Sequence, residues 1–175
     1  RSIINARARP MNIKLSFTPV SQNPLDLLIV VLDADTVLHE ADDPQIARHL
    51  EKAAAGFREK TQKREYHVTL PEGSNVGALV AYWSPSLKSW NLWENVKTCT
   101  ARGLRLARDC GHARVGILMN SAAAAPLVGK VTEGAILGAY TFDRYKQEKD
   151  EFLQKEAQVT ILVHPEHRAD AEARK

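Results

Sequence analysis

The run from Asp26 to Leu32, which reads D-L-L-I-V-V-L, limits the fold of this chain more than any other stretch. After its first residue it contains only apolar side chains, many of them β-branched, over a length that suits a strand. A strand without polar alternation is typical of a position buried on both faces of a sheet. Because both faces must then be covered, the sequence predicts helices on both sides of a central sheet.

Other strands follow from shorter patterns. Asn12 to Phe17 alternates apolar and polar residues, which predicts a half-buried strand. Further β-rich runs are 66–70, 77–83, 114–119 and 158–163. The turn cluster Pro71-Glu72-Gly73-Ser74-Asn75 separates 66–70 from 77–83, so these two runs form either a hairpin or two neighbouring strands.

Three helices are expected between the strands. The first begins at Asp43-Pro44, an N-cap followed by proline at the first helical position, and should end at Gly56. The second spans about 90–109, and the third about 124–139. On the second helix, apolar and small residues recur at spacings of three and four and predict one buried stripe: Leu92, Val96, Cys99, Gly103, Leu106 and Cys110. The element order predicts a three-layer α/β fold with a mixed central sheet flanked by helices.

Length and composition fit one ordinary globular domain. With 175 residues and a net charge of +3, the chain is neither strongly basic nor long enough to suggest two domains. No apolar run approaches the roughly 20 residues of a membrane span. Cys99 and Cys110 would lie about 16 Å apart on one helix, too far for a disulfide. Two free thiols favour a reducing, cytoplasmic location.

Metal and phosphate sites are not supported by the motifs. Asp33 and Asp35 could open a calcium loop, but Leu38 and Pro44 stand where an EF-hand needs glycine and glutamate. His164 and His167 have no acidic or thiol partner nearby in sequence. Gly129-Lys130 matches the end of a phosphate-binding P-loop only in part, because Ala124 and Val131 replace the required glycine and hydroxyl residue.

Catalytic groups are also missing from the sequence. Ser74 and Ser121 lack the G-x-S-x-G context of a nucleophilic serine, and both cysteines fall on the predicted buried stripe. We therefore assign no catalytic, cofactor-binding or metal-binding residue to this chain.

Basic and aromatic residues leave two alternatives. The basic positions are Arg58, Lys60, Lys63, Arg64, Arg102, Arg105 and Arg108, and the acidic residues interleaved with them are Glu59, Glu65, Glu94 and Asp109. A solvated charged face is favoured over a stripe that follows phosphates. Trp90 and Trp93 anchor the second helix in the core or, if exposed with Trp83, mark a partner surface.

The stretch from Glu133 to Lys146 reads E-G-A-I-L-G-A-Y-T-F-D-R-Y-K. It resembles the E-G-x-x-L-x-x-Y-x-F-D-x-Y-K signature that closes the N-terminal domain of the cytosolic leucyl aminopeptidases, a metallopeptidase family. The resemblance extends over about 11–174 and is specific at the signature. Two places depart from the family pattern: Phe57-Arg58-Glu59-Lys60 lacks the glycine of F-x-G-K, and Ala81-Tyr82-Trp83-Ser84 replaces a G-L-G motif.

The resemblance implies a domain division and a function. Residues 1–10 are a tail or leader, 11–164 form a macro-domain-like N-terminal domain, and 165–175 begin a linker helix toward a catalytic domain. The family's catalytic residues and its two divalent metals, zinc or manganese, belong to that catalytic domain. This chain would then have no peptidase activity alone. It would contribute to assembly of a homo-oligomer, a hexamer in the family, and to control of access to the active sites.

Gly134 and Gly138 within the signature are expected to let their helix approach the sheet closely, and Tyr140, Phe142 and Tyr145 to bury large apolar area. Two other functions stay open. One is a macro-like module that binds ADP-ribose or a related nucleotide, and the other is an accessory domain that binds DNA. No membrane partner is expected.

Overall fold

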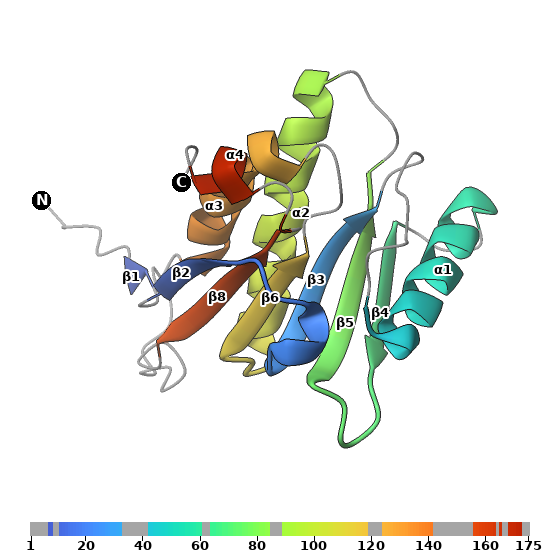
Figure 1. The fold of residues 1–175 in the computed structure, drawn as a ribbon. Coiled ribbons are helices and arrows are strands. Elements are labelled where there is room, and N and C mark those ends of the chain that lie inside the picture. The colour runs from blue at the N-terminus through green and yellow to red at the C-terminus, as the bar shows by residue number, and fades with distance from the viewer. Residues whose placement is uncertain are drawn as a thin grey trace, which may run out of the picture.

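The computed structural model describes the backbone of residues 7–8, 11–32, 42–60, 64–84, 89–118, 124–141, 156–163, 165 and 168–172. Within these ranges, the side chains of 7–8, 89–93, 124–126, 140–141 and 170 are not described. The described residues form the predicted three-layer α/β arrangement, with helices on both faces of a six-stranded sheet (Figure 1).

The sheet is mixed, as predicted. Its strands, in spatial order, are β2 (Met11–Ser16), β8 (Ala157–Leu162), β6 (Arg114–Leu118), β3 (Leu25–Leu32), β5 (Val76–Trp83) and β4 (Glu65–Thr69). All neighbouring pairs are parallel except β4 with β5, which is antiparallel. The apolar run that predicted a central strand is β3, which has β6 on one side and β5 on the other.

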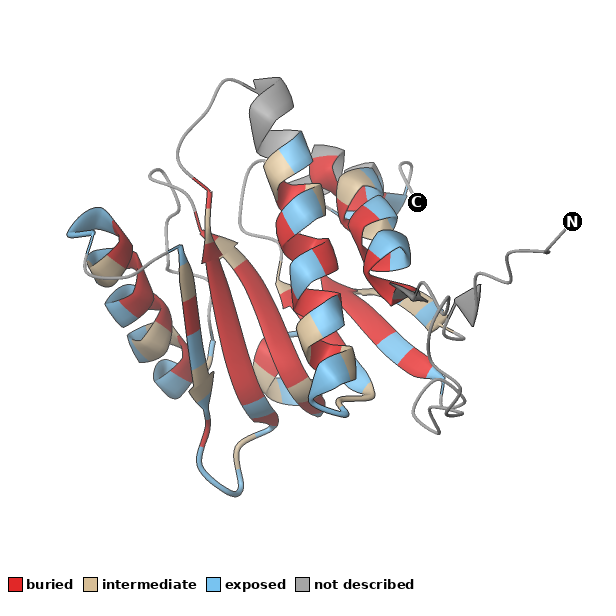
Figure 2. Ribbon diagram, turned by 180° about the vertical axis from the view of Figure 1, so that it is seen from behind, coloured by how far each residue is buried: buried red, intermediate tan, exposed pale blue. Residues whose placement is uncertain are grey.

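Helices cover the two faces unequally. Helix α1 (Pro44–Arg58) packs on one face, and α2 (Ser89–Asp109) and α3 (Ala124–Ala139) pack side by side on the other (Figures 1 and 2). The core is divided accordingly into two apolar clusters, one on each side of β3. A short 3₁₀ helix, η1 (Val20–Gln22), precedes β3, and α4 (Arg168–Glu172) contacts α3.

A small second sheet joins the start of the described chain to the signature segment. Strand β1 (Arg7–Ala8) pairs antiparallel with β7 (Tyr140–Thr141), which continues directly from α3. Residues 142–155 lie outside the described residues, and so do Phe142 and Tyr145 of the signature.

The local signals at the first helix were partly right. Asp43 caps α1 by accepting hydrogen bonds from the amides of Gln45 and Ile46 at 2.8 and 3.3 Å, as expected of an N-cap. The predicted end at Gly56 is wrong, because α1 continues to Arg58. The extra turn buries Phe57 in the core beside the ring of Trp83, with ring centroids 5.5 Å apart.

Of the two arrangements left open for strands 66–70 and 77–83, the hairpin is confirmed. Tyr66 pairs with Ala81 and Val68 with Leu79 in antiparallel register. Gly73 in the connecting turn has φ of 90°, a conformation that glycine adopts without the cost other residues incur.

The buried stripe predicted on α2 is correct at its centre and wrong at its end. Val96, Cys99 and Gly103 are buried, but Cys110 is exposed because the helix ends at Asp109. The sequence pattern also missed a second buried face. This face is turned toward α3, and its members are Thr100, Ala101 and Leu104.

The signature glycines make a closer contact than predicted, and with a different partner. A Cβ atom on Gly138 would lie 2.8 Å from the carbonyl oxygen of Ala101 and 2.6 Å from the Cβ of Leu104, both on α2. A Cβ on Gly134 would overlap the carbonyl oxygen of Lys97. The expectation that these glycines serve helix–sheet contact is therefore wrong: they allow the backbones of α3 and α2 to touch.

The contact between α2 and α3 predicts that alanine destabilises the protein at Gly138 but not at Gly129. Gly138→Ala should lower the free energy of unfolding by about 1–3 kcal/mol, because the methyl group forces two packed helices apart. Gly129→Ala is the matched control on the same helix, since a Cβ there meets nothing within 4 Å. It should be neutral, or stabilising by up to about 1 kcal/mol. Urea unfolding followed by circular dichroism measures both, and equal effects would contradict the contact.

Candidate functional site

The carboxyl ends of the parallel strands form the best candidate for a binding site. The helix that follows β3 lies on one face of the sheet, whereas the helices that follow β5 and β6 lie on the other (Figure 1). The chain thus leaves neighbouring strands toward opposite faces, and in open α/β sheets ligands bind in the crevice outside such a switch point. We call this edge, at Leu32, Ser84 and Leu118, the carboxyl edge.

Ser84 is the notable polar residue at the carboxyl edge. Its backbone amide donates to the carbonyl oxygen of Leu32 at 2.7 Å, which holds it at the junction of β5 and β3. The residue is 1% exposed, and its Oγ has no hydrogen-bond partner among the described residues. Buried hydroxyls without a partner are uncommon in folded proteins, so this atom is a candidate contact for a polar ligand group.

Several candidate residues from the sequence follow the strands and lie outside the described residues. Asp33 and Asp35 follow β3, and Ser121 follows β6; all three lie outside the described residues. The same is true of His164 and His167, and of the side chains of Trp90 and Trp93. Trp83 is half-buried against Phe57, so of the three tryptophans it alone is placed, and its ring belongs to the core around α1.

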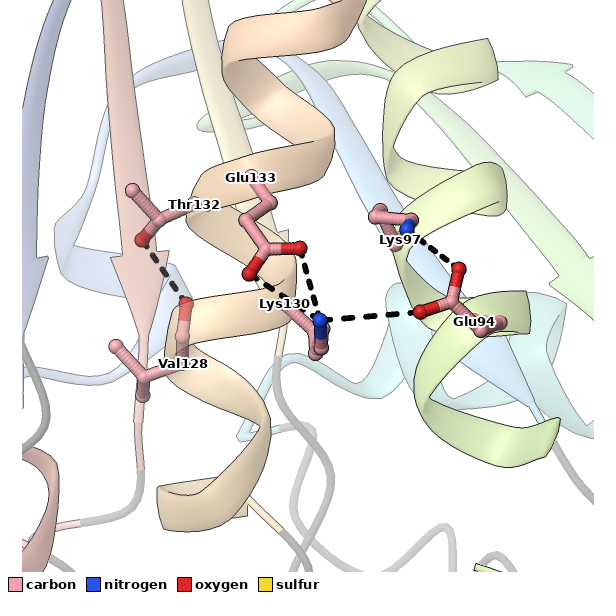
Figure 3. A network of polar contacts seen from close by, with 6 residues as sticks. All are labelled: Glu94, Lys97, Val128, Lys130, Thr132 and Glu133. Atoms are coloured by element: carbon pink, nitrogen blue, oxygen red, sulfur yellow. Dashed lines mark hydrogen bonds and ion pairs between the residues drawn. The ribbon is translucent and has the colours of Figure 1, made fainter. Parts of the chain in front are cut away.

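The Gly129-Lys130 pair lies within helix α3 and not in a loop. The Nζ of Lys130 donates to both carboxylate oxygens of Glu133 at 2.9 and 3.2 Å (Figure 3). The carboxylate of Glu94 on α2 lies 3.8 Å from the same Nζ and also pairs with Lys97. Lys130 thus bridges two exposed carboxylates across α2 and α3.

Two of the three arginines on α2 pair with carboxylates. Arg102 pairs with Glu65 at 3.1 Å, and its guanidinium lies 5.2 Å from the ring centroid of Tyr82. Arg108 pairs with the neighbouring Asp109 at 2.9 Å. These contacts favour the solvated charged face that the sequence predicted over a nucleic-acid surface.

Asp42, in the described part of the acidic stretch before α1, has a structural role. The carboxylate of Asp42 accepts hydrogen bonds from the backbone amides of Val20 at 3.1 Å and Ser21 at 3.3 Å. It therefore ties the start of α1 to η1, a contact that no local sequence pattern indicates. Among the described residues, no group of three or more His, Cys, Asp or Glu residues could hold a metal ion.

A second carboxylate that sequence reasoning missed is Asp26, at the amino end of β3. Its Oδ2 accepts from the amides of Ala113 and Arg114 at 2.9 and 2.8 Å, and its Oδ1 accepts from the Arg114 guanidinium at 2.7 and 3.1 Å. Partial burial raises the pKa of Asp26, but the hydrogen bonds from Arg114 and Ala113 outweigh it and hold the pKa below its ordinary value. The carboxylate of Asp26 therefore joins β3 to the start of β6, and we call this set of hydrogen bonds the Asp26 clamp.

The two cysteines differ in their environments. Burial raises the pKa of the Cys99 thiol to about 11, whereas Cys110 is exposed beyond the end of α2. A thiol buried in this way is inert, and neither cysteine has the partners of a catalytic nucleophile among the described residues.

Similar proteins are found by fold alone. The chain matches no model of a known protein family, and no curated protein gives a significant sequence match. A mutant of tomato leucine aminopeptidase superposes with a TM-score of 0.59 at 16% identity, over 94% of this chain and 35% of that one. A mutant of the Oceanobacillus iheyensis macrodomain superposes with a TM-score of 0.56 at 10% identity, over 99% of this chain and 93% of that one.

The macro domain of ganglioside induced differentiation associated protein 2 gives a TM-score of 0.54 at 14% identity, over 92% of this chain and 81% of that one. At these identities the likeness establishes the fold, which is macro-domain-like, as predicted. This chain spans about a third of the aminopeptidase and most of each macrodomain. No described helix is long and apolar enough to cross a membrane.

The Asp26 clamp predicts a dependence of stability on pH. In the unfolded chain this carboxyl titrates near 3.8, and in the folded protein it titrates lower. The stabilisation is therefore present above pH 3.8 and is lost as the pH falls through the folded pKa. Asp26→Asn should lower the free energy of unfolding at pH 7 by about 1–3 kcal/mol and flatten its decline below pH 4. Asp109→Asn, at an exposed pair, is the control and should change little.

The cysteine environments predict selective labelling. An aromatic disulfide reagent at pH 8 should modify Cys110 at least about tenfold faster than Cys99, because only Cys110 is accessible. Cys110→Ser should remove the fast phase. A fast phase that persists in this variant would show that Cys99 is reached without unfolding.

Proposed function

We propose that this chain is the non-catalytic N-terminal domain of a leucyl aminopeptidase. The parent enzyme would remove N-terminal residues from peptides, using two divalent metals, zinc or manganese, in a separate catalytic domain. The observation that carries the proposal is the Glu133 to Lys146 segment. Its sequence resembles the family signature, and it lies in a domain whose fold superposes on tomato leucine aminopeptidase over 94% of the chain.

The packing of the segment supports this assignment. Gly134 and Gly138 face α2 at backbone contact, so their positions are required by the fold. Ile136 and Leu137, on the same helix, are 44% and 48% exposed and are the large apolar side chains that the described surface leaves most open. Exposed apolar residues suit contact with another domain or subunit. A role in oligomer assembly and in access to the active sites, in the cytoplasm, follows as part of the proposal.

An activity assay tests the absence of catalysis. The purified chain should not release the chromophore from a leucyl anilide in the presence of Zn²⁺ or Mn²⁺, because the described residues contain no metal-binding group. Metal-dependent release above the rate of a heat-denatured sample would overturn the proposal. Sequencing the gene beyond the codon for Lys175 provides the positive test: a metallopeptidase domain is expected there.

The second candidate function is a macro-like module that binds ADP-ribose or a related nucleotide. It is favoured by the macrodomains, which match over 65–99% of their own length, and by the Ser84 hydroxyl at the carboxyl edge, which has no partner among the described residues. Titration calorimetry with ADP-ribose separates the two functions. Micromolar binding that is weakened by Ser84→Ala would favour the module, and no heat at millimolar ligand would remove it.

Binding to DNA is the remaining alternative. The pairing of Arg102 and Arg108 with carboxylates speaks against it. Affinity for duplex DNA that falls steeply with salt would support this function, and no binding at low salt would exclude it.

A further inference from the structure

The outer edge of β4 is one of the two edges of the six-stranded sheet. β4 pairs with β5 on one side, and no described strand pairs with it on the other. Helix α1 lies next to β4 at this end of the sheet (Figures 1 and 2). It packs against β5, and its His49 Nδ1 lies 2.8 Å from the hydroxyl of Tyr66 on β4.

The hydrogen-bond ladder between β4 and β5 shows which residues of β4 direct their backbone groups away from the sheet. At its two ends, the amide of Trp83 donates to the carbonyl oxygen of Arg64 at 2.8 Å, and the amide of Leu70 donates to that of Gly77 at 2.8 Å. Hydrogen-bonded pairs alternate along an antiparallel ladder, so Tyr66 and Val68 also direct their backbone groups toward β5. The residues between them direct their N–H and C=O groups away from the sheet: Glu65, His67 and Thr69.

This edge lacks the devices that usually protect one. β4 contains no proline and no lysine, and the charge of Glu65 is met by Arg102 at 3.1 Å. The opposite edge strand, β2, carries the exposed Lys14. A strand that approaches β4 therefore meets three donors and three acceptors and little net charge.

We infer that β4 pairs antiparallel with β4 of a second copy of this chain, about a two-fold axis at His67. In this register each His67 exchanges both backbone hydrogen bonds with its equivalent, and Glu65 pairs with Thr69 of the second copy. All three outward residues are then used. A two-fold axis at Tyr66 or Val68 would use only two of them, and one at Glu65 would place two carboxylates opposite each other.

The side chains match in the same register. On the face that carries α1, Tyr66 lies opposite Val68 of the second copy, and the same pair occurs again across the axis. Aromatic and β-branched residues in opposed positions stabilise sheets, and the pairing buries Val68, which is half-buried in one copy. On the other face, Glu65 meets the hydroxyl of Thr69. The two His67 side chains lie opposite each other on this face, between the two Glu65–Thr69 pairs, as a two-fold axis at His67 requires.

Proline at the central position tests the pairing directly. Because the His67 amide points outward, His67→Pro removes the hydrogen bonds across the axis while the ladder to β5 stays intact. Two hydrogen bonds are lost per dimer, so the dissociation constant should rise about tenfold or more. His67→Ala, which keeps the amide, is the matched control and should dimerise as the wild type does. Sedimentation velocity over a range of concentrations measures all three proteins, and circular dichroism confirms that each is folded.

Amide hydrogen exchange gives a second readout that needs no substitution. With rising protein concentration, exchange should slow at Glu65, His67 and Thr69, while Tyr66 and Val68 exchange slowly at every concentration. A wild-type protein that stays monomeric at millimolar concentration would overturn the inference. A folded His67→Pro variant that dimerises as strongly as the wild type would do the same, because the dimer would then use another surface.

Discussion

The burial of β3 on both faces is the constraint on which the rest of the domain depends. Leu27 and Ile29 belong to the core under α2 and α3, and Leu28 and Val30 to the core under α1. All four are 1% exposed or less, and each contributes about 1.5–3 kcal/mol by leaving water. A shift of one residue in register would exchange the two sets between the cores. The Asp26 clamp, one residue before them, fixes the register of β3 against β6.

The second constraint is the contact between α2 and α3. Two helices share one face of the sheet, and the glycines of α3 let their axes approach until backbone meets backbone. This close packing explains why the most distinctive segment of the sequence contains small residues and no reactive groups. It also turns Ile136 and Leu137 outward, where they are exposed. This exposure is the basis of the proposed role in assembly.

The fold could be predicted from the sequence in large part because its signals are local. The cap at Asp43, the turn at Gly73 and the apolar run of β3 each act through neighbouring residues. Lys130 and Arg102 pair with carboxylates, as residues of a solvated charged face do. The candidate site was harder to predict from the sequence. The buried hydroxyl of Ser84 becomes notable only once β5 and β3 lie side by side.

Periodicity failed where a helix has more than one packing partner. A single stripe on α2 accounts for contact with the sheet, but Ala101 and Leu104 are buried by α3, which the sequence of α2 does not reveal. Cys110 matched the stripe in spacing and yet lies past the helix end.

The sequence by itself determined the element types and the two-sided burial of β3, since these depend on side-chain polarity and backbone preference within a few residues. Only the tertiary structure decided what those elements touch. It brought Asp26 to the amides of Ala113 and Arg114, set Gly138 against α2, and left the amide of His67 facing outward. Such contacts join residues far apart in the chain, and they exist only once the sheet order is fixed.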